Sequence, residues 1–122
     1  MPKKIVYIED DIEMTYLIKM ILERKGYEII STNNGLEGFD LVTKEKPDLI
    51  LLDLMMPEID GWDLYHQIRS NELIKSIPVV IISAKAQPID KVLGLQIAKV
   101  DNYIAKPFKP QELIEVIENL LS

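Results

Sequence analysis

The sequence contains no cysteine and a single histidine, and its cationic residues are outnumbered by its anionic ones. The absence of cysteine excludes thiol nucleophiles, Cys-ligated zinc and iron–sulfur clusters, and it fits a reducing compartment such as the cytoplasm, where we expect the protein. Lys and Arg number 14 against 20 Asp and Glu, so the formal net charge is −6. A nucleic-acid binder normally carries a basic surplus, so direct binding of DNA or RNA is not expected.

Long hydrophobic runs are also missing. Two lysines follow the initial Met-Pro, but the apolar run after them covers only residues 5–8 before acidic residues begin. A signal peptide or a membrane span needs a longer run, so we expect neither. The chain has 122 residues, 48% of them hydrophobic and 28% charged, which is typical of one globular domain over 1–122. A domain of this size folds without a disulfide or a structural metal.

Short apolar runs alternate with longer amphipathic segments. Strands are predicted at 5–8, 49–52 and 79–82, because continuous apolar runs are typical of a parallel sheet that is covered on both faces. Weaker strand patterns lie at 28–32 and 102–105.

Apolar residues spaced three and four apart predict helices at 14–22, 89–97 and 113–121, each with one apolar stripe. Segments 35–46 and 60–70 are less periodic, but they begin with turn and capping residues. The order is therefore strand then helix, five times over, which predicts an α/β sheet with right-handed crossovers.

Polar side chains follow four of the five predicted strands. After the first, third, fourth and fifth strands come, in turn, Glu9-Asp10-Asp11, Asp53, Ser83 and Lys106. Nothing comparable follows the second strand, which favours an edge position for it. Ligands of an open α/β sheet bind beyond the carboxyl ends of its strands. Leaving Asp11 aside, we therefore expect three carboxylates, a hydroxyl and an ammonium to converge at one edge.

Carboxylates that lie a few ångströms apart repel one another, so this group needs a cation. Lys106 supplies one positive charge, and a divalent ion would supply two. Ligands that are all oxygen favour Mg²⁺ or Mn²⁺ over zinc or copper, and Mg²⁺ keeps coordination room for a phosphoryl group. Taken singly, each residue also fits a solvated loop, a turn or a helix cap, the role we assign to Asp11. Only their joint occurrence at four strand ends points to a site.

Four segments resemble those of one known family: IVYIEDD at 5–11, LILLDLMMPEIDG at 49–61, VVIISAK at 79–85 and NYIAKPF at 102–108. Over essentially its whole length the chain resembles the receiver domain of two-component response regulators. This resemblance implies a flavodoxin-like (βα)5 fold: a doubly wound, five-stranded parallel sheet in strand order 2-1-3-4-5 with helices on both faces.

The resemblance also implies a metal site beside a phospho-acceptor. Asp53 is expected to be the phospho-acceptor and a metal ligand. Asp10 is expected to bind Mg²⁺ directly, and Glu9 to act through water. Met55 would offer its backbone carbonyl to the same ion.

Three further residues acquire roles from the resemblance. Lys106 is expected to pair with a phosphoryl oxygen, and its bond to Pro107 is expected to be cis. Ser83 corresponds to the switch hydroxyl, and Tyr103 corresponds to the switch aromatic.

The implied reaction is phosphoryl transfer to Asp53 from a phosphohistidine on a histidine kinase or a histidine phosphotransfer protein. Ser83 would then move toward the phosphoryl group and Tyr103 would turn inward. The surface of the fourth helix, fifth strand and fifth helix would change shape for a downstream protein. We do not expect the protein to be an enzyme; it would catalyse only its own phosphoryl transfer and slow autodephosphorylation. We expect it to be a monomer or a weak phosphorylation-dependent dimer.

The chain departs from the family at the turn before the fifth predicted strand. The usual Gly-Ala pair is replaced by Ala98-Lys99-Val100, and the turn is one residue longer. Met55 and Lys85 lie where the family tunes hydrolysis, so we hypothesise that they shield the acyl phosphate from water. His66 is interpreted as a surface residue.

Two other functions fit parts of the pattern. A hydrolase of the haloacid dehalogenase class shares the aspartyl nucleophile and Mg²⁺, but it has a second Asp two residues later, where this chain has Met55. A flavodoxin-like cofactor binder needs a phosphate loop after the first strand, where the acidic run 9–11 would repel phosphate. The initial Met1 and the end directly after the last predicted helix favour a complete single-domain regulator over a fragment.

Overall fold

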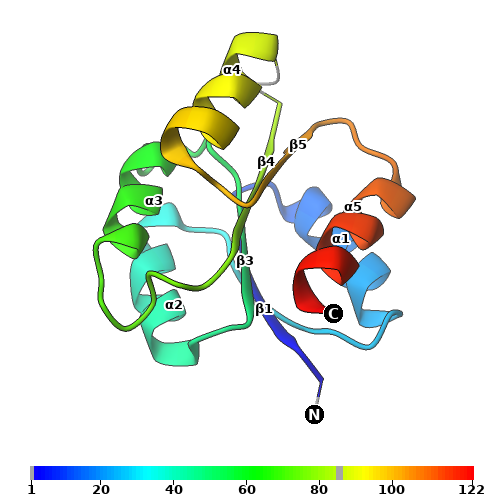
Figure 1. Cartoon of the computed structure of the whole chain (residues 1–122). Coiled ribbons are helices and arrows are strands. Elements are labelled where there is room, and N and C mark those ends of the chain that lie inside the picture. Colours follow the sequence, from blue (N-terminus) through cyan, green and yellow to red (C-terminus); the bar gives the residue numbers. More distant parts are fainter. Residues whose placement is uncertain (1, 85–86) are drawn as a thin grey trace.

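The computed structural model describes residues 2–84 and 87–122. Five parallel strands form one sheet in the order β2-β1-β3-β4-β5 (Figure 1). The strands are β1 (Lys4–Ile8), β2 (Glu28–Thr32), β3 (Leu49–Leu52), β4 (Val79–Ser83) and β5 (Asn102–Ala105). The predicted α/β fold and its strand order are confirmed, and β2 occupies an edge as expected.

Helices cover both faces of this sheet. They are α1 (Ile12–Glu23), the 3₁₀ turn η1 (Gly35–Glu37) with α2 (Gly38–Glu45), α3 (Gly61–Arg69), α4 (Pro88–Val92) with the π-helical η2 (Leu93–Ala98), and α5 (Pro110–Leu121). Figure 1 shows α1 and α5 on one face and α2 and α3 on the other, with α4 on the α3 side. None of the helices within 2–84 and 87–122 combines the length and the apolar character that a membrane crossing requires.

Strand side chains alternate between two apolar layers. Tyr7 and Leu51 pack with the α1 and α5 side chains, whereas Ile8 and Leu52 pack with those of α2 and α3. All four are fully buried, which explains why the strand sequences are continuously apolar. Because every second residue of a strand shares a face, Glu9 continues the face of Tyr7 beyond the end of β1.

Aspartates cap two helices that begin close to the carboxyl edge of the sheet. The Asp11 side chain accepts a hydrogen bond from the Met14 N–H at 3.1 Å at the start of α1, as predicted. Asp60 accepts one from the Trp62 N–H at 2.8 Å at the start of α3. Each cap stabilises its helix by about 1 kcal/mol and also fixes the loop that precedes it.

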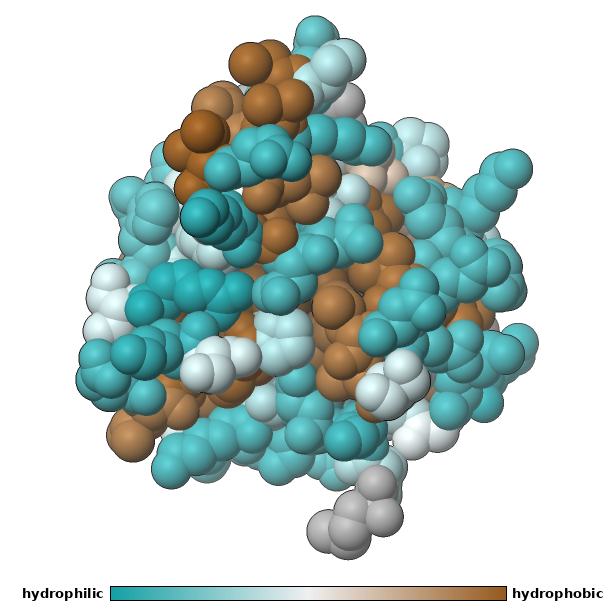
Figure 2. Space-filling model, viewed as in Figure 1, coloured by the Kyte–Doolittle hydropathy of each residue, from teal (hydrophilic) through white to brown (hydrophobic). Residues whose placement is uncertain are grey.

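The apolar stripe predicted on the fourth helix faces solvent instead of the core. Figure 2 shows apolar surface gathered over α4, and the predicted stripe residues are all exposed: Ile89, Val92, Leu93 and Ile97. The core-facing position belongs to Gly94, where an added Cβ would lie 2.7 Å from Cδ2 of Tyr103. The apolar pattern therefore indicated the wrong side of this helix, because the residue that meets the sheet is a glycine and carries no apolar side chain.

Candidate functional site

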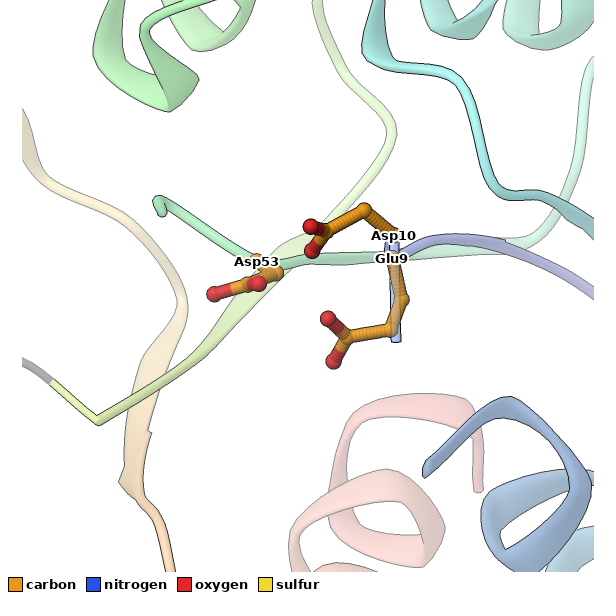
Figure 3. A group of neighbouring side chains, drawn as sticks. All are labelled: Glu9, Asp10 and Asp53. Atoms are coloured by element: carbon orange, nitrogen blue, oxygen red, sulfur yellow. The ribbon is translucent and has the colours of Figure 1, made fainter. Parts of the chain in front are cut away.

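Three carboxylates converge where β1 and β3 end. Carboxylate oxygens of Glu9, Asp10 and Asp53 lie within 4.8 Å of one another. Figure 3 shows the three side chains projecting from the two strand ends toward a shared space. Glu9 and Asp53 are buried, with exposed fractions of 1% and 3%, and Asp10 is partly exposed. The fold therefore brings together the acidic residues that the strand ends placed at one edge.

Lys106 brings a cation into this acidic cluster. Its Nζ lies 2.6 Å from Glu9 Oε1 and 3.7 Å from Asp53 Oδ2. The Lys106–Pro107 peptide bond is cis, as the resemblance implied. The Lys106 N–H donates to the Ser83 carbonyl at 2.9 Å, which ties the end of β5 to the end of β4. One ammonium beside three carboxylates leaves the cluster with an excess of negative charge when all are ionised.

Burial and charge shift the pKa values of the two buried carboxyls in opposite directions. Burial raises the pKa of Asp53 to about 7, and the neighbouring Glu9 adds to this effect, while Lys106 and the Met55 N–H oppose it. Burial also opposes the ionisation of Glu9. Hydrogen bonds with Asp53, Lys106 and Tyr7 outweigh it and hold the pKa of Glu9 below its ordinary value. The same surroundings therefore favour the protonated form of Asp53 and the ionised form of Glu9.

Asp10, the third carboxyl of the cluster, resembles Asp53 in that its pKa is raised. Burial raises the pKa of Asp10, and the charges of Glu9 and Glu58 contribute in the same direction. The donor set is made only of carboxylate oxygens, which suits Mg²⁺ or Mn²⁺ better than a softer metal. The charge and the chemistry of the cluster thus fit a hard divalent cation.

The family of the chain follows from its sequence. The sequence profile described as the response regulator receiver domain matches residues 5–118. The chain belongs to the response regulator receiver domain family. Receiver domains are signalling domains that interact with histidine kinases and downstream effectors.

Curated relatives and solved structures agree with this membership. The receiver domain is 38% identical over 121 residues to the alkaline phosphatase synthesis transcriptional regulatory protein PhoP of Bacillus subtilis, covering 99% of this chain and 49% of that protein. It is 37% identical over 118 residues to the CpxR homolog of Haemophilus influenzae, covering 97% of this chain and 50% of that protein. The chain thus spans about half the length of these relatives. A response regulator structure from Chloroflexus aurantiacus matches with a TM-score of 0.91 and 30% identity, over 99% of this chain and 98% of that chain.

The two residues expected to form the switch of this receiver domain lie in contact. Ser83 is fully buried at the end of β4, and Tyr103 in β5 is 4% exposed. Burial raises the pKa of Tyr103, while a hydrogen bond with Ser83 opposes that shift. The Tyr103 ring already lies inward beneath η2, where Gly94 and Trp62 pack together with it, so the inward turn expected on phosphorylation has no outward starting position in this structure.

The turn before β5 has the geometry of a glycine turn without a glycine. Lys99 adopts a left-handed conformation with φ 62°. Its N–H donates to the Gly94 carbonyl, and the Val100 N–H donates to the same oxygen at 3.0 Å. The i→i+5 hydrogen bonds of a π-helical turn enclose one residue more than those of an α-helix, and η2 ends in this left-handed turn of the receiver domain.

The sequence also singled out Met55, Lys85 and His66, and the shielding role of Met55 and Lys85 stays a prediction. Met55 is 59% exposed beside Asp53, and its N–H donates to Asp53 Oδ1 at 3.2 Å. Lys85 lies outside the described residues. His66 is exposed on α3, as predicted. Tyr65 is buried, and its hydroxyl donates to the Ala98 carbonyl at 2.6 Å.

Three residues that were not singled out from the sequence also support the site. The Tyr7 hydroxyl donates to Glu9 Oε1 at 2.7 Å, and Asn33 Nδ2 donates to the Glu9 carbonyl at 2.8 Å. Glu58 adds a negative charge near Asp10. Residues two apart in a strand lie on the same face, so the position of Tyr7 two residues before Glu9 could have indicated their contact. Asn33 and Glu58 lie in loops, where no periodic pattern indicates a partner.

Proposed function

We propose that residues 1–122 act as one receiver domain that accepts a phosphoryl group on Asp53. The donor would be a phosphohistidine on a histidine kinase or a histidine phosphotransfer protein. The acidic cluster carries this proposal, because a buried aspartate lies within 4.8 Å of two further carboxylates and 3.7 Å from the Lys106 ammonium. In the transfer, the P–N bond to the imidazole breaks, its electron pair stays with the imidazole nitrogen, and a P–O bond forms to the Asp53 carboxylate.

Glu9, Asp10 and Asp53 would hold Mg²⁺, or Mn²⁺ in its place, with the Met55 backbone carbonyl as a further ligand. The bound dication would neutralise negative charge on the transferring group. Asp53 attacks as the ionised carboxylate, and the nearby Lys106 ammonium favours that form. Glu9 holds Lys106 Nζ at 2.6 Å, which places this ammonium to pair with a phosphoryl oxygen. Positioning and charge neutralisation therefore account for the chemistry.

The signal would leave through the surface formed by α4, β5 and α5. A phosphoryl oxygen on Asp53 offers the Ser83 hydroxyl a charged acceptor that competes with Tyr103. Ser83 is hydrogen-bonded to Tyr103, and the Tyr103 ring packs beneath Gly94 of η2. A change at Ser83 would therefore change how the Tyr103 ring packs against η2. Downstream proteins would read that change, and so would a second copy in a weak phosphorylation-dependent dimer.

The proposed role is that of a signalling module and not of an enzyme with free turnover. Two residues after the acceptor, where a hydrolase of the haloacid dehalogenase class has an acid–base Asp, this chain has Met55. The acyl phosphate is therefore expected to decay slowly. We also propose a cytoplasmic protein, where a kinase would supply the phosphoryl group, and the net charge of −6 argues against nucleic acid as a direct partner.

Intact-protein mass spectrometry after incubation with acetyl phosphate and Mg²⁺ tests this function. We expect at most one phosphoryl group per chain, lost slowly after the donor is removed. Asp53→Asn should gain none, whereas Asp40→Asn, which changes an exposed aspartate of α2, should match the wild type. Equal labelling of Asp53→Asn would remove Asp53 from the mechanism. Rapid release of many phosphates per chain would favour the hydrolase instead.

A further inference from the structure

Tyr7 places a polar atom inside an otherwise apolar layer. Tyr7 is fully buried among the apolar side chains of the cluster between the sheet, α1 and α5. A buried phenol hydroxyl is costly unless it finds a hydrogen-bond partner. The partner here is a carboxylate of the acidic cluster, because Tyr7 precedes Glu9 by two residues on the same face of β1 and its hydroxyl donates to Glu9 Oε1 at 2.7 Å.

The same Glu9 oxygen receives a second donor. Lys106 Nζ lies 2.6 Å from Oε1, so two donors occupy the two lone pairs of that atom. The other oxygen, Oε2, accepts a long hydrogen bond of 3.4 Å from the Asp11 N–H, and the Glu9 carboxylate also shares a hydrogen bond with Asp53. The Tyr7 hydroxyl and the Lys106 ammonium thereby restrict rotation of the Glu9 carboxylate, which lies beside Asp10 and Asp53.

We infer that Tyr7 is a positioning residue of the metal site: its buried hydroxyl orients the Glu9 carboxylate toward the cation. This inference rests on the proposed function, since it requires that Glu9, Asp10 and Asp53 hold a divalent ion. An aromatic ring that only fills the core would do so equally well as phenylalanine. The hydroxyl is the part of the side chain that reaches the acidic cluster.

Tyr7→Phe tests the contribution of the hydroxyl apart from that of the ring, because phenylalanine fills the same space without the donor. Tyr65→Phe is a matched control: it also removes a hydroxyl from a buried tyrosine, but that hydroxyl is bonded to the Ala98 carbonyl at 2.6 Å, in the turn at the end of η2. Tyr7→Phe loses the hydrogen bond to Glu9, whereas Tyr65→Phe loses the bond to Ala98 and the one that Arg69 Nε donates at 3.1 Å, so both variants should lose stability. Only the first should lose metal affinity.

The test is a Mn²⁺ titration of the unphosphorylated 122-residue chain, followed by electron paramagnetic resonance. Tyr7→Phe is expected to bind Mn²⁺ about tenfold more weakly than the wild type, as is typical when a group that orients a metal ligand is removed. Tyr65→Phe should bind as the wild type does. The rise in unfolding temperature on adding Mg²⁺ should shrink in Tyr7→Phe alone, and Tyr7→Met, which also lacks a donor, should repeat both results.

Two outcomes separate this inference from the function on which it depends. Equal Mn²⁺ affinities in the wild type, Tyr7→Phe and Tyr65→Phe would overturn the role of Tyr7 and leave the metal site intact. A wild-type chain that binds no Mn²⁺ would overturn the metal site itself. If Tyr65→Phe weakened binding as much as Tyr7→Phe does, the effect would be a general loss of rigidity, and the positioning role would be wrong.

Discussion

Replacing Asp53 by asparagine should stabilise the folded chain at alkaline pH, because the wild type must bury a charge among like charges. The pKa of Asp53 rises from 3.8 to about 7 on folding. Since each tenfold change in proton affinity is worth about 1.4 kcal/mol, ionising Asp53 costs the folded state about 4 kcal/mol at most. Part of that cost falls on the coupled Glu9, so we expect Asp53→Asn to gain about 2 kcal/mol at pH 8.

The sign of the pH dependence follows from the raised pKa. Below about pH 3, Asp53 is protonated in the folded and unfolded chains, and asparagine offers no advantage. As the pH rises toward 7, the unfolded chain loses the proton first, and the wild-type free energy of unfolding falls relative to that of Asp53→Asn. The lowered pKa of Glu9 stabilises the fold at pH values above its unfolded pKa of 4.5, so this contribution is constant between pH 5 and 8.

Urea unfolding followed by the fluorescence of Trp62, the single tryptophan, measures these differences. Mg²⁺ at tenfold its dissociation constant should stabilise the wild type by about 1.4 kcal/mol and Asp53→Asn by less. Glu23→Gln, which neutralises an exposed carboxylate of α1, should stay within about 0.5 kcal/mol of the wild type at each pH. A difference between wild type and Asp53→Asn that does not change from pH 5 to pH 8 would refute the reasoning.

Three further substitutions test the turn, the switch and a cap. Lys99→Gly should raise the free energy of unfolding by about 1 kcal/mol, since glycine adopts the left-handed conformation without strain; a loss of stability in urea would contradict that geometry. Gly94→Ala adds a Cβ 2.7 Å from the ring of Tyr103, so the ring resonances of Tyr103 should shift in NMR spectra, and unchanged resonances would count against the packing. Asp11→Ala removes the hydrogen bond to the Met14 N–H and should cost about 1 kcal/mol in thermal unfolding; no change would mean that the cap is unimportant in solution.

The sheet could be predicted because its signal is local. Continuous apolar runs such as Leu49–Leu52 are fully buried between two helical layers, and the polar residue after each run marks the carboxyl edge of the sheet. Glu9 and Asp53 are far apart in the sequence, yet the parallel arrangement of β1 and β3 brings them together. Sequence and topology therefore sufficed for the acidic cluster.

The fourth helix was predicted less well because its structure depends on a tertiary contact. Periodicity placed Ile89 and Ile97 on a core-facing stripe, but both are exposed. Gly94 faces the ring of Tyr103 instead. A glycine that permits close packing carries no hydrophobic signal, so a pattern of apolar residues does not reveal which side of this helix is buried.

Hydrogen bonds between side chains and distant backbone atoms were also beyond the sequence. Asn33 donates to the carbonyl of Glu9 from a loop 24 positions away, and the Tyr65 hydroxyl reaches the carbonyl of Ala98 across 33 positions. Such contacts depend on where complete elements pack, and neither partner has a local pattern that indicates the other. They are what the structure adds to the sequence at this site.

Chemical mapping of the phosphorylated residue tests the central claim most directly. Borohydride reduces an aspartyl phosphate to homoserine, so peptide mass spectrometry of protein treated with acetyl phosphate identifies the acceptor. With Mg²⁺ present, we expect homoserine at position 53, and with a chelator in place of Mg²⁺ we expect almost none. Homoserine at Asp10, or labelling of Asp53 that is equally strong without a divalent ion, would contradict it.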